Sequence, residues 1–133
     1  MGCDAHVCAE VKIGGAWVSY AVNISMPRSY ALFERMAGVR GGVSNAIAAP
    51  RGIPNDTAWM TQFACEHFGE DGHSHSWLSH AEIQEFYKWA EVNAAWFDFD
   101  RDCTYFFGNS WGDPRKCWPS GIEDVRWVFW FDN

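Results

Sequence analysis

Two short polar motifs hold three of the five histidines of this 133-residue chain. The first is Gly2-Cys3-Asp4-Ala5-His6, and the second is His73-Ser74-His75-Ser76-Trp77. Side chains alternate between the two faces of a strand, so a strand over residues 3–13 would carry a polar row on one face. Such a row favours a strand that lines a ligand pocket, and an edge strand with a solvated polar face is the alternative. The row consists of Asp4, His6, Cys8 and Glu10.

Imidazole groups from the two motifs could carry out acid–base chemistry. His6 would act with His73 or His75 as base and acid in the cleavage of a phosphodiester, with a ribose 2′-hydroxyl as the nucleophile. Asp4 would orient the neighbouring imidazole or raise its pKa. An arginine would stabilise the negative charge that develops on the phosphate. The pattern therefore predicts these three histidines and Asp4 as catalytic residues.

A divalent metal ion is an alternative to metal-free catalysis. Asp4 and His6 could bind one ion together, because residues two apart on a strand have Cα atoms about 6.6 Å apart. Glu10 would lie about 20 Å from Asp4 along an extended strand and could not share that ion. The sequence contains no HExxH motif or other defined ligand spacing. We therefore expect no cofactor, although Asp4 and His6 could together bind a divalent metal ion.

The chain is acidic, with a formal net charge of −7. This argues against general nucleic-acid binding and against binding to an anionic membrane, since both need a basic surface. Residues 28–51 nevertheless contain four arginines and one glutamate, and arginine presents a planar fork of donors that suits a small phosphate ligand. Helix capping or pairing with acids is the alternative role for these arginines. The candidate phosphate ligands are Arg28, Arg40 and Arg51.

Aromatic residues are abundant, with nine tryptophans and ten phenylalanines. Part of this set must form the core, and the remainder could stack on a base or a sugar. Trp77 in the second motif is the candidate for such stacking, and packing that holds its own segment in place is the alternative. Glu10 completes the candidate ligand-binding residues of the polar strand face.

Five cysteines are present, without a CxxC motif or zinc-finger spacing. Cys3 and Cys8 would lie on opposite strand faces about 16 Å apart, which excludes a disulfide between them. The sequence shows no signal peptide, apolar membrane span or lipidation signal. We therefore expect free, inert thiols, a cytoplasmic location and no membrane partner.

The elements that position these residues follow from local patterns. Residues 3–13 and 16–24 are rich in Val, Ile, Trp and Tyr and flank Gly14-Gly15, which predicts a hairpin of two strands. Ser29 can cap a short helix that ends at Gly38 and buries Leu32, Phe33 and Met36. From Gly38 to Pro54 the chain is rich in Gly, Pro and small residues, which predicts a long loop of the kind that often carries function.

A second and a third helix are expected after this loop. Asp56 could cap the second helix, which runs to about His67. Its apolar stripe would be Trp59, Met60, Phe63 and Ala64. Residues 69–76 are predicted to be a loop. Ser79 and Glu82 form a capping box that begins the third helix, whose buried residues would be Ile83, Phe86, Tyr87 and Ala90.

The last third of the sequence predicts one strand. Residues 98–102 favour a loop or an edge, and residues 105–121 favour irregular structure. Residues 125–131 predict a strand so apolar that both of its faces are covered. Together the patterns predict a single domain, 1–133, of the α+β class. It would consist of a small, mainly antiparallel sheet, from the N-terminal hairpin and the C-terminal strand, packed by about three helices.

The motifs together resemble a family of small, mostly uncharacterised bacteriophage proteins. Members open with Gly-Cys-Asp-x-His and a Glu four residues on, seen here as residues 2–10. An Arg-x-Tyr-x-Leu-Phe…Ala-Gly-Val-Arg stretch matches residues 28–40, Pro-Arg-Gly-x-Pro matches residues 50–54, and His-x-x-Ser-Trp-Leu matches residues 73–78. The match covers roughly the first 95 residues. Ala5 departs from the isoleucine that is usual there, which affects packing and not chemistry.

The resemblance implies a phage-type origin, in the cytoplasm of an infected bacterium, and a shared polar site. That site would consist of Asp4, His6, Arg28, Tyr30, Arg40, Arg51, His73 and His75. Some phage proteins of this size disarm bacterial immunity by cleaving or sequestering cyclic nucleotide signals. The resemblance suggests the same role here by association of context.

Three functions follow as hypotheses. The first is an enzyme that cleaves a phosphodiester in a small cyclic nucleotide immune signal, with His6 and His75 transferring protons and tryptophans stacking the bases. The second is a non-enzymatic sponge that binds a cyclic nucleotide or an ADP-ribose derivative in the same pocket. The third is a protein-binding inhibitor of a host defence factor, with the acidic region 66–102 as its interface. The partner would be a small anionic nucleotide under the first two hypotheses. All three hypotheses are compatible with an oligomeric protein.

Overall fold

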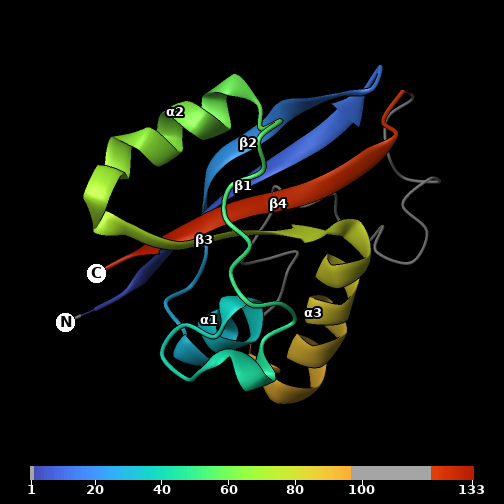
Figure 1. Cartoon of the computed structure of the whole chain (residues 1–133). Helices are drawn as coiled ribbons and strands as arrows, with labels where there is room; N and C mark the ends of the chain where they lie inside the picture. Colours follow the sequence, from blue (N-terminus) through green and yellow to red (C-terminus); the bar gives the residue numbers. More distant parts are fainter. Residues whose placement is uncertain (1, 97–120) are drawn as a thin grey trace.

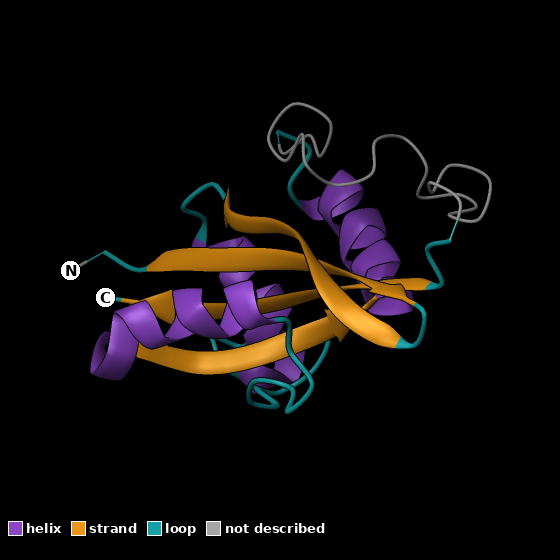
Figure 2. Ribbon diagram, turned by 90° about the horizontal axis from the view of Figure 1, so that it is seen from above, coloured by secondary structure: helices purple, strands orange, loops and turns teal. Residues whose placement is uncertain are grey.

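The computed structural model describes residues 2–96 and 121–133. The expectations for residues 98–102 and for most of residues 105–121 lie outside the described residues. Four strands form one antiparallel sheet in the order β2-β1-β4-β3. Within these residues the fold is α+β with three α-helices, in agreement with the prediction of about three (Figures 1 and 2). The strands are β1 (Asp4–Ile13), β2 (Ala16–Ser25), β3 (Gly72–Ser79) and β4 (Asp124–Asp132).

The hairpin of β1 and β2 is confirmed, and its turn explains the glycine pair. Gly14 and Gly15 have φ angles of 59° and 78°, a left-handed conformation at both turn positions. Two-residue hairpin turns with positive φ match the twist of the flanking strands and strongly favour glycine. Ile13 pairs with Ala16 directly beside this turn, so the turn sets the register of the hairpin.

Strand β4 lies between β1 and β3 and is covered on both faces, as its apolar sequence predicted. Its alternate residues Trp127, Phe129 and Phe131 enter the larger core, whereas Trp130 enters a smaller cluster on the opposite face. A strand buried on both faces gains hydrophobic stabilisation from residues on both sides, which is why its sequence lacks polar alternation.

Two helices, α1 (Tyr30–Ala37) and α3 (His80–Asn93), cover the face of the larger core (Figure 1). Ser29 caps α1 by accepting a hydrogen bond from the Leu32 backbone N–H, and Gly38 ends it in the left-handed conformation. Helix α3 begins with the capping box of Ser79 and Glu82, and both hydrogen bonds of this motif are present. Both helices and their caps are confirmed, because local side-chain chemistry determines such ends.

Helix α2 (Trp59–Phe68) covers the other face of the sheet, and here two predictions were wrong. Ala58, and not Asp56, is the N-cap residue, while Asp56 binds Arg126 at 3.0 Å. Of the expected apolar stripe only Ala64 faces the sheet, next to the buried Thr61, whereas Trp59, Met60 and Phe63 are exposed. The sheet beneath already presents the large Trp130 ring, so small side chains fit between the two layers.

The predicted loop over residues 69–76 was also wrong for most of its length. Only Gly69–Asp71 form a turn, of 3-10 type, and the chain then enters β3 at Gly72. The β3 residues carry few apolar side chains, but their backbone pairs with β4. Hydrogen bonding to a distant strand creates this edge strand, so no local apolar pattern signals it.

A buried ion pair joins α2 to the sheet. Glu10 on β1 is fully buried and accepts a hydrogen bond of 2.8 Å from the Arg126 side chain on β4. The second Glu10 oxygen accepts from the Ala58 backbone N–H at 2.9 Å, at the start of α2. The Arg126 guanidinium also lies 4.0 Å from the centre of the Trp17 ring. Both charges are therefore compensated within the interior.

Replacing Glu10 by Ala should lower the free energy of unfolding by about 3–5 kcal/mol, because Arg126 would lose a buried charge partner. Replacing Asp4 by Ala removes an ion pair that is half-exposed, and we expect a much smaller loss. Urea denaturation followed by far-UV circular dichroism measures both. An equal decrease in the free energy of unfolding of the two variants would contradict the claim that the buried ion pair matters more for stability than the half-exposed one.

Candidate functional site

Most candidate residues lie at one end of the sheet, on both of its faces, where both chain termini lie (Figure 1). The start of β1, the end of β4 and the start of β3 are adjacent there, since Asp4 pairs with Asp132 and Asp132 pairs with Gly72. The segment just before α1 joins them through Arg28, which binds Asp4. We call this set the terminal cluster, and its candidate members are Asp4, His6, Arg28, Tyr30, Arg40, His73 and His75.

His6 is held by a carboxylate, and that carboxylate is Asp132. His6 Nε2 lies 2.9 Å from Asp132 Oδ1, with the two side chains 21% and 26% exposed. The imidazole packs on the ring of Phe68 at the end of α2, with ring centres 4.1 Å apart. Sequence reasoning missed Asp132 because it lies 126 residues from His6. Only the pairing of β1 with β4 brings it to the imidazole.

Asp4 binds Arg28 and not the imidazole. Its two oxygens accept hydrogen bonds of 2.8 and 2.9 Å from the Arg28 guanidinium. This pairing lowers the pKa of Asp4, so the carboxylate stays charged at neutral pH. A Cβ atom on Gly2 would contact the same guanidinium, so a larger residue there would displace the flexible end of Arg28.

A bulge separates the two histidines of the second motif. His73 pairs with Phe131 and Ser76 pairs with Phe129, so β3 has one residue more than β4 between these pairs. Ser74 absorbs the extra residue with a φ of 54°. As a result the His73 ring stacks near Phe131, at 6.3 Å, and lies on the side of the larger core. The His75 ring stacks beside Trp130 on the α2 side.

Trp130 lies between His6 and His75. Its ring centre is 6.1 Å from the His6 ring and 6.4 Å from the His75 ring, each at an interplanar angle of 25°. The three rings come from β1, β4 and β3, which are neighbours in that order. The two imidazoles therefore share one face of the sheet but are separated by a fully buried indole. This spacing does not bring both of them to one proton-transfer site.

The charge state of His75 also follows from its position. Burial lowers the pKa of His75, and the nearby His73 lowers it further. The neutral imidazole therefore dominates at neutral pH. A neutral ring can accept a proton or a hydrogen bond, but it is a poor proton donor.

Arg40 and Tyr30 form a second contact within the terminal cluster. The Arg40 guanidinium lies 5.1 Å from the centre of the Tyr30 ring. Arg40 also hydrogen-bonds the thiol of Cys3. Burial raises the pKa of Cys3 in spite of this cation, so the thiol stays protonated and unreactive.

Arg51, Trp77 and Glu10 lie apart from the terminal cluster. Both terminal nitrogens of Arg51 donate to the Glu82 carboxylate, and the guanidinium lies 4.3 Å from the centre of the Trp77 ring. Burial favours neutral Glu82, but the hydrogen bonds from Arg51 and Ser79 outweigh it and lower the pKa of Glu82. This clamp at the start of α3 matches the alternative roles, which were pairing with an acid for Arg51 and packing for Trp77. Glu10 belongs to the buried ion pair described above.

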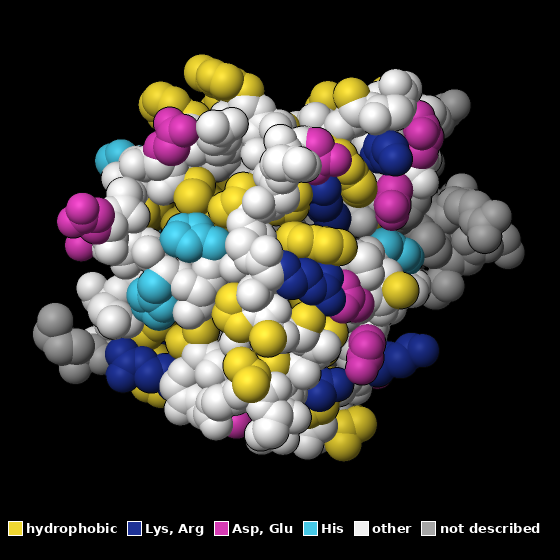
Figure 3. All heavy atoms as spheres, in the orientation of Figure 1, with side chains coloured by type: hydrophobic (Ala, Val, Ile, Leu, Met, Phe, Trp, Pro, Cys, Tyr) yellow, Lys and Arg dark blue, Asp and Glu magenta, His cyan; other side chains and the backbone are white. Residues whose placement is uncertain are grey.

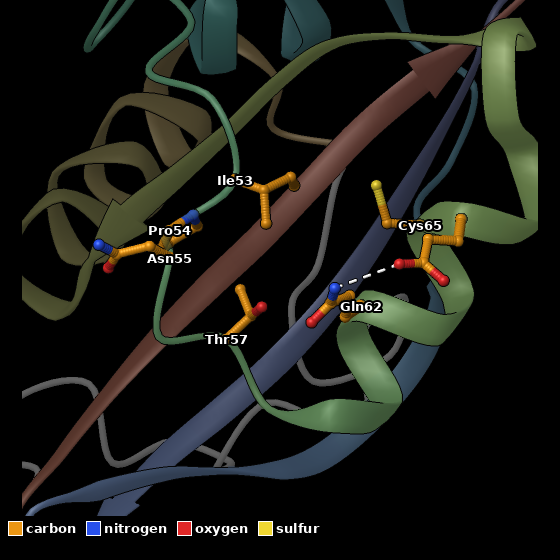
Figure 4. Close-up of a pocket in the computed structure, with 7 residues that line it drawn as sticks. Ile53, Pro54, Asn55, Thr57, Gln62 and Cys65 are labelled. Atoms are coloured by element: carbon orange, nitrogen blue, oxygen red, sulfur yellow. Dashed lines mark hydrogen bonds between the residues drawn. The ribbon is translucent and has the colours of Figure 1, made fainter.

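Two of the hollows that border α2 lie between this helix and other described segments. The first has a volume of about 290 Å³ and lies between α2 and the segment from Ile53 to Thr57 (Figure 4). Cys65 and Gln62 from α2 face this segment in Figure 4, and burial raises the pKa of Cys65. The second, of about 410 Å³, lies between α2 and Val22 of β2. Neither His6 nor His75 lines them, and sequence reasoning anticipated neither hollow.

The surface of the terminal cluster is polar. Figure 3 shows histidine side chains gathered toward one side of the visible face, next to a basic side chain. In the described part of the chain, no three His, Cys, Asp or Glu side chains come together in a group that could hold a metal ion. Asp4 and His6 each engage another side chain, Arg28 and Asp132 respectively.

Comparisons with protein families, with curated proteins and with solved structures find no match for this chain. Within the described residues, no helix is long and apolar enough to span a bilayer.

We expect an NMR titration of the His75 ring protons to give a pKa below the usual 6.5. Folding then favours neutral His75, so protonation costs stability as the pH falls below 6.5 toward the folded-state pKa. The variant His75→Gln lacks this cost, and its free energy of unfolding should fall less than that of the wild type between pH 7.5 and pH 5. A difference between the two proteins that stays constant with pH would contradict the burial of His75.

Proposed function

We propose that this protein cleaves a phosphodiester of a small anionic nucleotide, such as a cyclic dinucleotide immune signal in an infected bacterium. The observation that carries the proposal is the pair of His6 and Asp132, next to Asp4 and the Arg28 that binds it. A carboxylate that holds one imidazole nitrogen fixes the tautomer and leaves the other nitrogen free to act as a base. The pair is partly exposed, so a ligand could approach it.

His6 would be the general base. With Nε2–H donating to Asp132, Nδ1 makes no hydrogen bond to any other described residue and can accept a proton. It would take the proton of a ribose 2′-hydroxyl, whose oxygen then attacks phosphorus. The bond from phosphorus to the leaving 5′-oxygen breaks, and the products are a 2′,3′-cyclic phosphate and a 5′-hydroxyl. Asp132 would stabilise the imidazolium that forms.

Water, and not His75, would supply the proton to the leaving oxygen. The lowered pKa of His75 keeps it neutral, and Trp130 separates it from His6. The sequence hypothesis of a paired base and acid is therefore replaced by one base with solvent as the acid. His75 would accept a hydrogen bond from the ligand.

Arg28 and Arg40 would hold the phosphate. Arg28 is bound by Asp4 and half-exposed, so a phosphate would share or exchange the Asp4 contact. Arg40 lies over the ring of Tyr30, a residue that is 42% exposed. An exposed phenol ring next to a cation offers a surface on which a base could stack.

Sequestration without cleavage is the second candidate. Binding needs no proton transfer, and the indole between the two imidazoles removes the two-histidine arrangement that most favoured an enzyme. In that case the same cluster would bind the nucleotide and release it intact.

Incubation with a panel of cyclic dinucleotides, followed by liquid chromatography and mass spectrometry, tests the proposal. We expect linear products ending in a 2′,3′-cyclic phosphate. The variant His6→Gln should lose activity by about 100- to 10,000-fold, the usual contribution of a general base. The variant Asp132→Asn should reduce turnover and shift its pH profile, while nucleotide binding remains.

The matched control is His80→Gln, which removes an imidazole at the start of α3, outside the terminal cluster. It should retain full activity. Ligands that bind tightly but return intact, also with added Mn²⁺ or Zn²⁺, would establish sequestration and reject the enzyme. Neither binding nor turnover by the wild type would reject both.

A further inference from the structure

Helix α2 exposes large apolar side chains on the side away from the sheet. Trp59 is 72% exposed, Phe63 is 60% exposed and Met60 is 42% exposed. The Trp59 and Phe63 rings stack on each other with centres 5.5 Å apart. Hydrophobic side chains protrude at the top of Figure 3, where Figure 1 places α2. We call these three residues the outer face of α2.

The buried and exposed side chains of α2 are the opposite of those expected for a surface helix. An amphipathic helix normally buries its large apolar residues and exposes its small or polar ones. Here Thr61 and Ala64 face the sheet, although Trp59 and Phe63 would remove far more apolar area from water. Local rules are broken mainly at functional sites, and an exposed apolar patch of this kind marks an interaction surface.

The outer face is shaped to accept side chains. Met60 and Phe63 border the hollow of about 410 Å³ that also reaches Val22 on β2. Trp59 and Phe63 border another of about 160 Å³ next to Gln62 and Glu66. Two adjoining hollows along an aromatic ridge suit the successive apolar side chains of a helix, which recur every three or four residues.

The charges around this face are acidic. Residues 52–87 contain no lysine or arginine, and β2 contains no charged residue. Glu66, Glu70 and Asp71 are exposed at the C-terminal part of α2 and in the turn after it. A second copy of the chain would bring like charges together, and an anionic surface would be repelled. A basic partner would be attracted.

We propose that the outer face of α2 binds an amphipathic helix of another protein, with an apolar stripe flanked by lysine and arginine. The apolar stripe fills the hollows beside Phe63, and the basic residues face Glu66, Glu70 and Asp71. This interaction requires no chemistry at His6, and it is separate from the nucleotide function proposed above.

Selection from a phage-displayed library of random 16-residue peptides tests this inference. We expect the wild-type protein to enrich peptides with apolar residues at positions i, i+3 or i+4, and i+7, and with lysine or arginine between them. Fluorescence anisotropy of the labelled peptides then measures their affinity. Trp59→Ala with Phe63→Ala should weaken binding at least about tenfold, as for central aromatic residues of interfaces.

Two further variants separate the contributions. Val43→Ala with Val92→Ala removes apolar side chains that are exposed elsewhere, and it should leave binding unchanged. Glu66→Lys with Glu70→Lys should weaken binding of the basic peptides and remove its dependence on salt. All these side chains are exposed, so folding should be retained, which circular dichroism verifies.

Several results would overturn the inference. One is enrichment of acidic peptides or of peptides without the apolar pattern. Another is a Trp59 and Phe63 double variant that binds the selected peptides as tightly as the wild type. A third is binding of the protein to phosphatidylcholine vesicles through these two residues. Self-association in analytical ultracentrifugation that the same double variant abolishes would assign the face to a second copy instead.

Discussion

Burial of β4 on both faces is the constraint on which the rest of the structure depends. Residues 125–131 are all buried, so the sheet needs a layer on each side. Helices α1 and α3 provide one layer and α2 provides the other. Because β4 is central, it also determines which strands are neighbours, and it places β1 and β3 on its two sides. The rings of His6 and His75 therefore lie on either side of Trp130.

The two layers are unequal, and this has consequences for function. The layer of α1 and α3 contains the larger core, including Phe33, Phe86 and Trp127. The layer of α2 is thin, with a small buried cluster of Cys8, Ala64 and Trp130 and a buried ion pair at one end. Because the layer is thin, the large side chains Trp59, Met60 and Phe63 of α2 remain exposed to solvent. The thin layer also leaves His6 partly exposed beside Phe68.

Sequence patterns succeeded where the cause of structure is local. The glycine turn of the hairpin, the Ser29 cap and the Ser79 capping box each involve residues a few positions apart. They predicted helix α2 but not its N-cap or most of the side chains that it buries, and they failed for β3. The side chains that α2 buries depend on Trp130, more than sixty residues away, and β3 exists through its pairing with β4. Periodicity identifies an apolar stripe but not the surface that it meets.

For the candidate site, the sequence by itself determined which groups are present: two histidine motifs, an arginine-rich segment and a polar row on the first strand. It also determined that Asp4, His6, Cys8 and Glu10 share a face, because alternation is a property of any strand. Only the tertiary structure decided their partners. Asp132 holds His6, Arg28 takes Asp4, and the bulge at Ser74 sends His73 and His75 to opposite faces. Those outcomes depend on the register between strands distant in sequence, which no local pattern encodes.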